Sequence, residues 1–108
     1  MYFQYDKTGC RHLFKTYPHN VDEIKAAIEQ QVRQQAETDF SKTKLASRLP
    51  YEGQKVYECR VNVGKLPAVR VAFTFKGEAA YIAFASTDIQ KSTFSEAVGR
   101  FLSKAVKR

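Results

Sequence analysis

Two arginines on neighbouring predicted strands are the residues best suited to chemistry in this sequence. Arg60 lies in the alternating segment VYECRVNV and Arg70 follows the next turn, so an antiparallel hairpin would place both guanidinium groups on one sheet face. Lys55 lies at the start of the first strand, and Lys91 lies just before the last predicted helix. Cations held at this separation can bind adjacent phosphates, and a guanidinium can stabilise charge that develops on a phosphorane-like transition state. The pattern indicates a phosphate-binding face, and a solvated face with Glu58–arginine pairs across the strands is the alternative.

Acidic and aromatic residues near this face suggest two further roles. Glu58 and Asp88 are the nearest acids, and each could transfer a proton or act as the charge partner of a neighbouring cation. Tyr51 lies in a loop that also holds Lys44 and Arg48, where an aromatic ring can stack on an unpaired base. The other aromatic residues mostly have the spacing of core positions.

Motifs for metals, cofactors and nucleophilic catalysis are missing from the sequence. Cys10 and Cys59 are far apart, and His12 and His19 lack a CxxC or HExxH context. No glycine-rich phosphate loop and no GxSxG elbow occur. We therefore expect no metal and no small-molecule cofactor, and any catalysis should be of a kind that needs no such motif.

The hydrophobic patterns that position these residues predict an α+β domain. Asn20 and Glu23 have the spacing of a capping box ahead of the second helix, and the stretch 40–55 reads as a loop with one helical turn at most. The expected strands and helices cover 1–5 (strand), 10–17 and 21–38 (helices), 56–63, 69–75 and 79–86 (strands) and 92–108 (helix). We expect the N-terminal strand and the helical hairpin to pack on a small antiparallel sheet that a C-terminal helix completes.

Length and charge limit the class of protein. The 108 residues fit one domain, and the 44% apolar and 27% charged content is close to globular averages. A formal net charge of +7 favours polyanionic partners such as RNA, DNA or acidic protein segments. The longest apolar runs, such as 79–85, are far shorter than the roughly 18 residues of a membrane-spanning helix, and no basic-then-apolar leader opens the chain. We therefore expect a cytoplasmic protein that does not bind membranes.

Three segments of the chain, in this order and spacing, resemble the RelE-type toxins of bacterial toxin–antitoxin pairs, within the wider RelE/ParE group. YDKTGCRHLFKTYPHNVDEIKAAI resembles the strand and helical hairpin of that family, KVYECRVNVGKLPAVRVAFTF resembles its central strands, and STFSEAVGRFL resembles its C-terminal segment. The resemblance runs nearly end to end and implies a single RelE-like domain over 1–108. It also implies a metal-independent endoribonuclease that cuts mRNA in the ribosomal A site, and a cognate antitoxin protein as partner.

The resemblance implies roles for individual residues as well. Arg70 matches the arginine that follows the turn in the family, and Arg60 matches a basic position on the preceding strand. The second basic position on that strand falls on Glu58, which would repel phosphate unless it serves as a base. A family arginine after the last strand falls near Asp88, and a shift of a few residues gives its role to Lys91. The expected catalytic residues are Arg70, Arg60, Lys91 and Glu58.

One departure from the family leaves three functions open. The tyrosine that RelE-type enzymes use near the start of the last segment aligns with Phe94, whose ring can stack on a base but cannot exchange a proton. The chain is therefore a ribosome-dependent mRNA endoribonuclease, a ParE-like toxin that binds DNA gyrase, or a basic module that binds RNA or protein without catalysis. The first of these is the function we expect. Its RNA-binding residues would be Lys55, Tyr51, Phe94, Lys44 and Arg48.

Overall fold

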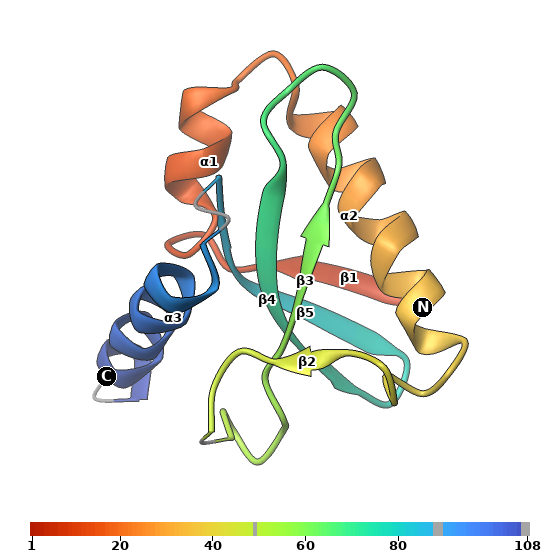
Figure 1. Cartoon of the computed structure of the whole chain (residues 1–108), viewed down its shortest axis with the longest axis vertical. Coiled ribbons are helices and arrows are strands. Elements are labelled where there is room, and N and C mark those ends of the chain that lie inside the picture. Colours follow the sequence, from red (N-terminus) through yellow and green to blue (C-terminus); the bar gives the residue numbers. More distant parts are fainter. Residues whose placement is uncertain (49, 88–89, 107–108) are drawn as a thin grey trace.

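A five-stranded β-sheet forms the centre of the fold, with its strands in the order β1-β5-β4-β3-β2 (Figure 1). The computed structural model describes residues 1–48, 50–87 and 90–106, and for residues 91, 92, 105 and 106 it describes the backbone alone. The strands are β1 (Tyr2–Tyr5), β2 (Lys44–Leu45), β3 (Tyr57–Val61), β4 (Val69–Lys76) and β5 (Ala79–Ser86). The helices are α1 (Arg11–Thr16), α2 (Val21–Ala36) and α3 (Lys91–Val106). This is the α+β class that the sequence predicts.

The sheet is mixed, whereas the sequence analysis expected only antiparallel strands. β3, β4 and β5 form the predicted antiparallel meander, but β1 lies parallel to β5, with Tyr2 opposite Ala79 and Tyr5 opposite Ile82. A parallel pair needs a long connection, which the two helices and the meander supply here. β5 lies between β1 and β4 inside the sheet, which explains why its sequence AAYIAFAS is apolar on both faces.

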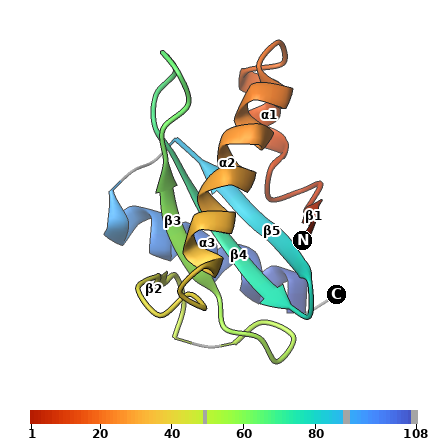
Figure 2. The ribbon, with the colours of Figure 1, turned by 90° about the vertical axis from the view of Figure 1, so that its right-hand side faces the viewer.

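Helices cover both faces of the sheet. α1 and α2 lie on one face and α3 lies on the other, and in Figure 2 α2 crosses in front of the strands while α3 passes behind them. On α2 the buried residues recur every fourth position, and they are Ile24, Ile28 and Val32. On α3 the buried residues have the same spacing, and they are Phe94, Val98 and Leu102. Each helix therefore packs one apolar stripe on the sheet, and the sheet face under α3 is the one that carries Arg60 and Arg70.

The segment between α2 and β3 differs from the expected loop. Instead of a helical turn it contains β2, which pairs antiparallel with β3 and places Lys44 opposite Glu58. The expected loop would have left β3 at the edge of the sheet along its whole length. With β2 in place, Glu58 has a strand on each side, because Ala72 of β4 lies opposite it on the other flank.

The helices begin and end within about two residues of the predicted bounds, apart from the predicted end of the last helix at 108, which lies outside the described residues. Asn20 precedes α2 as predicted, but the capping box does not form. The side chain of Asn20 makes no hydrogen bond to the helix backbone, and its Nδ2 donates to Glu23 Oε1 at 3.2 Å instead.

Candidate functional site

Arg60 and Arg70 lie directly opposite each other on β3 and β4, as the sequence predicts. The alternation of the two strands directs both residues to the face that α3 covers, while Cys59, Val61 and Val71 point to the core under α2. The two arginines differ in exposure. Arg60 is exposed, whereas only 16% of the Arg70 side chain is exposed.

Glu58 forms a buried ion pair with Arg70. Arg70 Nη1 donates to Glu58 Oε1 at 3.1 Å, and the Glu58 side chain is 1% exposed. The other carboxylate oxygen, Oε2, is also buried and accepts no hydrogen bond from the residues that the structure describes. In this conformation the carboxylate is enclosed and paired, and the expected role of Glu58 in proton transfer stays a prediction. Its surroundings are those of a charge partner, which was the alternative.

The ring of Phe94 lies below the same arginine. Arg70 Cζ is 5.9 Å from the Phe94 ring centroid, and Phe94 itself is fully buried between α3 and the sheet. A ring buried in this way is not open to stack on a base in this conformation, and the expected RNA contact of Phe94 stays a prediction. The residue instead supports the guanidinium from the protein side.

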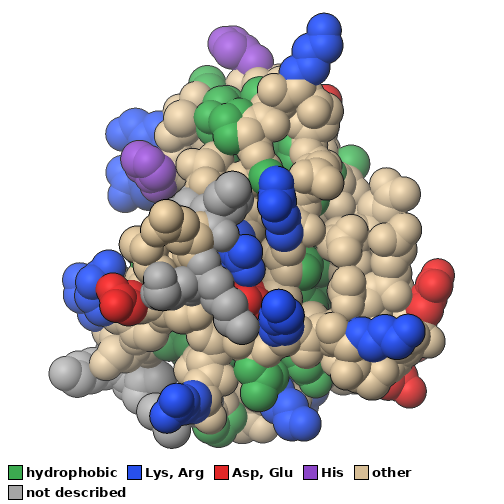
Figure 3. All heavy atoms as spheres, viewed as in Figure 1, with side chains coloured by type: hydrophobic (Ala, Val, Ile, Leu, Met, Phe, Trp, Pro, Cys, Tyr) green, Lys and Arg blue, Asp and Glu red, His purple; other side chains and the backbone are tan. Residues whose placement is uncertain are grey.

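A basic hollow of about 280 Å³ opens beside the arginine pair. Its charged lining residues, which define the hollow from here on, are Lys42, Lys44, Glu58, Arg60 and Arg70. Figure 3 shows Lys and Arg side chains gathered over β2, β3 and β4 around a recessed acidic side chain. Lys42, Lys44 and Arg60 are exposed and form no ion pair with any residue in the described ranges. Among the described residues, the hollow therefore presents three cations without an ion-pair partner, next to a fourth, Arg70, that is paired with Glu58.

Neutral side chains complete the lining of the hollow. Gln31 and Gln35 reach it from α2, and Cys59 forms part of its wall. Burial, and to a smaller extent the negative charge of Glu58, raises the pKa of Cys59 to about 12, while Arg70 acts in the opposite direction. The thiol is protonated at neutral pH and is a poor nucleophile. The arrangement can thus bind phosphate groups, and lysine ammonium groups are the exposed proton donors that the described residues place in it.

The remaining predicted site residues do not join the hollow. Lys55 and Arg48 are exposed and do not line it, and Tyr51 lies on the same sheet face but lines two other hollows. Lys91 is the first residue of α3, and its side chain lies outside the described residues. Asp88 lies outside them entirely.

Lys42 is a site residue that the sequence analysis missed. Lys42 and Lys44 alternate with Thr43, which is the spacing of side chains on one face of a strand. That pattern was the available signal for both β2 and the second lysine. The segment is too short for periodicity to distinguish a strand from a loop.

Comparison with known proteins gave no relative: no family model, no curated protein and no solved structure matches the chain. Within the described ranges, no helix is long and apolar enough to cross a membrane. The same residues contain no group of three or more His, Cys, Asp or Glu side chains placed to hold a metal ion.

Proposed function

We propose that this protein is a RelE-type toxin that binds mRNA in the ribosomal A site and cleaves it without a metal. The observation that carries the proposal is the cross-strand pair Arg60–Arg70, which shares one hollow with Lys42 and Lys44. Cations at this spacing match the negative charges of consecutive phosphates in an RNA backbone. The order of the elements, from an N-terminal strand through a helical hairpin to a meander, is in keeping with the resemblance of the sequence.

The proposed reaction is an internal transesterification. The ribose 2′-oxygen attacks the adjacent phosphorus, the P–O5′ bond breaks, and the products are a 2′,3′-cyclic phosphate and a 5′-hydroxyl. The proton of the 2′-hydroxyl is lost to solvent, and the 5′-oxygen gains one. Arg60, exposed at the hollow, would bind the phosphate and stabilise the charge that develops on its oxygens. Lys44, which lines the same hollow, would supply the proton to the leaving oxygen.

Arg70 takes the same electrostatic role only when phosphate replaces Glu58 as its partner. The guanidinium is bound through Nη1 to a buried carboxylate, so part of its charge is neutralised before RNA arrives. Arg60 is therefore the leading catalytic residue of the proposal, and Arg70 fixes the shape of the hollow.

The partners of the proposal are a cognate antitoxin and the translating ribosome in the cytoplasm. An antitoxin would cover the basic hollow with acidic side chains, because Lys42, Lys44 and Arg60 have no ion-pair partner within the described residues and such side chains would complement their charge. A partly disordered antitoxin segment that folds on binding can achieve this over a large surface.

A second candidate function is RNA binding without cleavage. It is favoured by one observation, namely that Glu58, expected as a base, and Phe94, which takes the place of the family's tyrosine, are both buried. Such a protein would occupy RNA and block translation without leaving cut ends.

Arg60→Ala is the variant that tests the proposal. Arg60 is exposed, so its loss should leave folding nearly intact, and Arg11→Ala on α1 is a matched control that removes an exposed arginine elsewhere. Induced wild-type protein should arrest bacterial growth and leave primer-extension stops within codons of abundant messages, and Arg60→Ala should remove both effects while Arg11→Ala keeps them.

Three other outcomes speak against cleavage at this site. Stops that persist in Arg60→Ala would place catalysis elsewhere. Arrest without stops, but with translation blocked, would favour the binding function. Arrest with intact translation and damaged DNA would favour gyrase as the target.

A further inference from the structure

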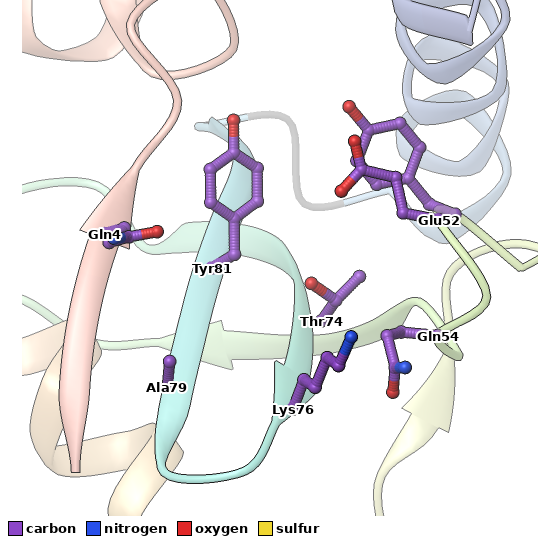
Figure 4. A pocket seen from close by; sticks show the side chains of 8 residues that line it. Gln4, Glu52, Gln54, Thr74, Lys76, Ala79 and Tyr81 are labelled. Atoms are coloured by element: carbon purple, nitrogen blue, oxygen red, sulfur yellow. The ribbon is translucent and has the colours of Figure 1, made fainter.

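Two hollows meet at Tyr51 on the sheet face that α3 partly covers. The first has a volume of about 380 Å³, and its lining includes one acid, Glu52, together with Gln4, Gln54, Thr74, Lys76 and Tyr81. Figure 4 shows this hollow, with the side chains of Thr74, Lys76 and Tyr81 rising from β4 and β5 on one side and Gln54 on the other. The second hollow has a volume of about 530 Å³ and lies against α3. Tyr51 lines both, and the pair of hollows is called the Tyr51 groove below.

A tight turn holds Tyr51 in place between the hollows. The backbone N–H of Tyr51 donates to Gln54 O at 2.8 Å, and that of Gln54 donates to Tyr51 O at 3.0 Å. The two residues between them, Glu52 and Gly53, both have positive φ, at 51° and 79°, as in the two-residue turns of hairpins. The ring is thus presented from a defined backbone position, and it packs partly against the core under α3.

The second hollow combines an aromatic floor with a basic rim. Phe84 and Phe101 form part of the lining, with ring centroids 5.6 Å apart. Arg100 and Lys104 lie four residues apart on α3, so they share one side of the helix, and both are exposed. Neither forms an ion pair with a residue that the structure describes.

Asp6, the acid in the second hollow, is already engaged by the protein. Its Oδ1 accepts a hydrogen bond from the Tyr81 hydroxyl, and its Oδ2 accepts one from the Gly9 backbone N–H at 2.7 Å. The carboxylate is thus bound by these two donors. Arg100 and Lys104 form no ion pair with it, and they make the rim of the hollow positively charged.

We propose that the Tyr51 groove binds single-stranded RNA, with a base against the Tyr51 side chain and phosphates on Arg100 and Lys104. An aromatic side chain that lines both hollows offers a surface for stacking, and the cations at the rim match a backbone that passes over it. Gln4, Gln54 and Thr74 add donors and acceptors of the kind that read base edges, which favours RNA over an acidic peptide. None of these residues lines the basic hollow, so this is a second RNA contact, and it rests on the proposed function only in taking RNA as the ligand.

The test is the binding of a fluorescein-labelled oligouridine 10-mer to the purified full chain, measured by anisotropy at several salt concentrations. Tyr51→Ala should weaken binding about tenfold, as expected for the loss of base stacking, while Tyr51→Phe should bind like the wild type. Tyr2→Ala is the control, because Tyr2 is the most exposed tyrosine, at 70%, and lies outside the groove.

The charges are tested by a second matched pair of variants. Arg100→Ala with Lys104→Ala should weaken binding and reduce the slope of log K against log salt by about 1.4, since two phosphate contacts on a single strand are lost. Arg11→Ala with Lys15→Ala removes an exposed arginine and lysine at the same spacing on α1 and should leave the slope nearly unchanged.

Three results would contradict RNA binding in the groove. The first is wild-type affinity in Tyr51→Ala, and the second is an equal loss of affinity in the Arg100/Lys104 and Arg11/Lys15 double variants. The third is polyglutamate of the same charge competing for the protein as well as unlabelled oligouridine does. The test is separate from that of the proposed function, because binding is measured without cleavage. Loss of cleavage in Arg60→Ala together with unaffected binding in Tyr51→Ala rejects the groove alone. Groove-dependent binding without any cleavage rejects the nuclease alone.

Discussion

Arg70 and Glu58 are held in a buried ion pair that makes each side chain depend on the other. Removing one partner of such a pair leaves a desolvated charge without compensation, which is far more costly than removing both. An alanine at position 70 would therefore disturb folding as well as any chemistry. This is why the exposed Arg60, and not Arg70, gives the clearer functional test.

We predict that Arg70→Met lowers the free energy of unfolding by about 3 kcal/mol, because Glu58 is left buried and unpaired while the methionine still packs near Phe94. The double variant Glu58→Leu, Arg70→Met should recover most of that loss, since no buried charge remains. Urea unfolding of the wild type, both single variants and the double variant measures the coupling. A double variant no more stable than Arg70→Met would show that the pair is not the cause.

The position of Arg60 opposite Arg70 could be predicted from the sequence, whereas the burial of Glu58 could not. Alternation on two strands with a short turn between them fixes which residues share a face and lie opposite each other. The burial of Glu58 depends on β2 and α3, which approach from distant parts of the chain. Local periodicity contains no signal for such a contact, so the same alternation suggested an exposed acid.

At the scale of elements, two glycines differ in their surroundings: Gly9 is packed against the backbone of β5, and Gly99 lies on an open side of α3. A Cβ at Gly9 would lie 1.8 Å from the backbone oxygen of Ala83, where the segment before α1 crosses β5. A Cβ at Gly99, on α3, would meet nothing within 4 Å among the described atoms. The first glycine is required by a close approach of two backbones, and the second is not.

We predict opposite effects of alanine at these two positions. Gly9→Ala should lower the stability by more than about 2 kcal/mol, because backbone atoms cannot move aside as a side chain can. Gly99→Ala should raise it by up to about 1 kcal/mol through improved helix propensity. Thermal unfolding followed by circular dichroism measures both, and a neutral Gly9→Ala would contradict the packing of this segment against β5.

Most helices and strands could be predicted because each carries its own period of apolar residues. α2 and α3 repeat every three to four residues, and β3 and β4 alternate. β2 could not be predicted, since two residues define no period and its pairing with β3 comes from tertiary contacts. The parallel placement of β1 was missed for a similar reason, because a single strand's sequence does not encode the direction of its neighbour.

At the scale of the whole molecule, buried ionisable groups set the response to high pH. Burial raises the pKa of both thiols to about 12, and the nearby Asp6 adds to the effect at Cys10. Burial also raises the pKa of Tyr5, whose hydroxyl donates to Glu29 at 2.7 Å, and that of Tyr81. In each case the folded state binds its proton more tightly than the unfolded chain does.

We predict that stability is constant up to about pH 8.5 and then falls as the pH rises towards 12. Above pH 8.5 the unfolded chain releases its thiol protons while the folded chain keeps them, so each thiol removes up to about 1.4 kcal/mol per pH unit. Cys10→Ala with Cys59→Ala should move the start of the fall towards pH 10, where the tyrosines take over. Urea unfolding between pH 7 and 10.5 measures this, and a flat profile in the wild type would contradict it.

Two basic regions lie along the sheet: the groove around Tyr51 on the face that α3 partly covers, and the basic hollow, which extends from Arg70 on that face to Gln31 and Gln35 of α2. The basic hollow lies at the end where β2 joins the sheet, and Lys76 and the groove around Tyr51 lie further along β4 and β5. The net charge of +7 is thus concentrated in part on a surface that a single polyanion could follow. A strand of RNA that meets both regions would explain why the cations are arranged along the sheet.

The most direct test of the central claim is cleavage by the purified protein of mRNA in a reconstituted ribosome complex with an empty A site. The proposal predicts cuts within the A-site codon that leave a 2′,3′-cyclic phosphate and a 5′-hydroxyl, in the presence of a metal chelator added after complex assembly. Arg60→Ala should reduce the rate by about 100-fold, as expected for the loss of one stabilising cation, while Arg11→Ala should cut like the wild type. Intact mRNA with the wild-type protein bound to the complex would contradict the nuclease.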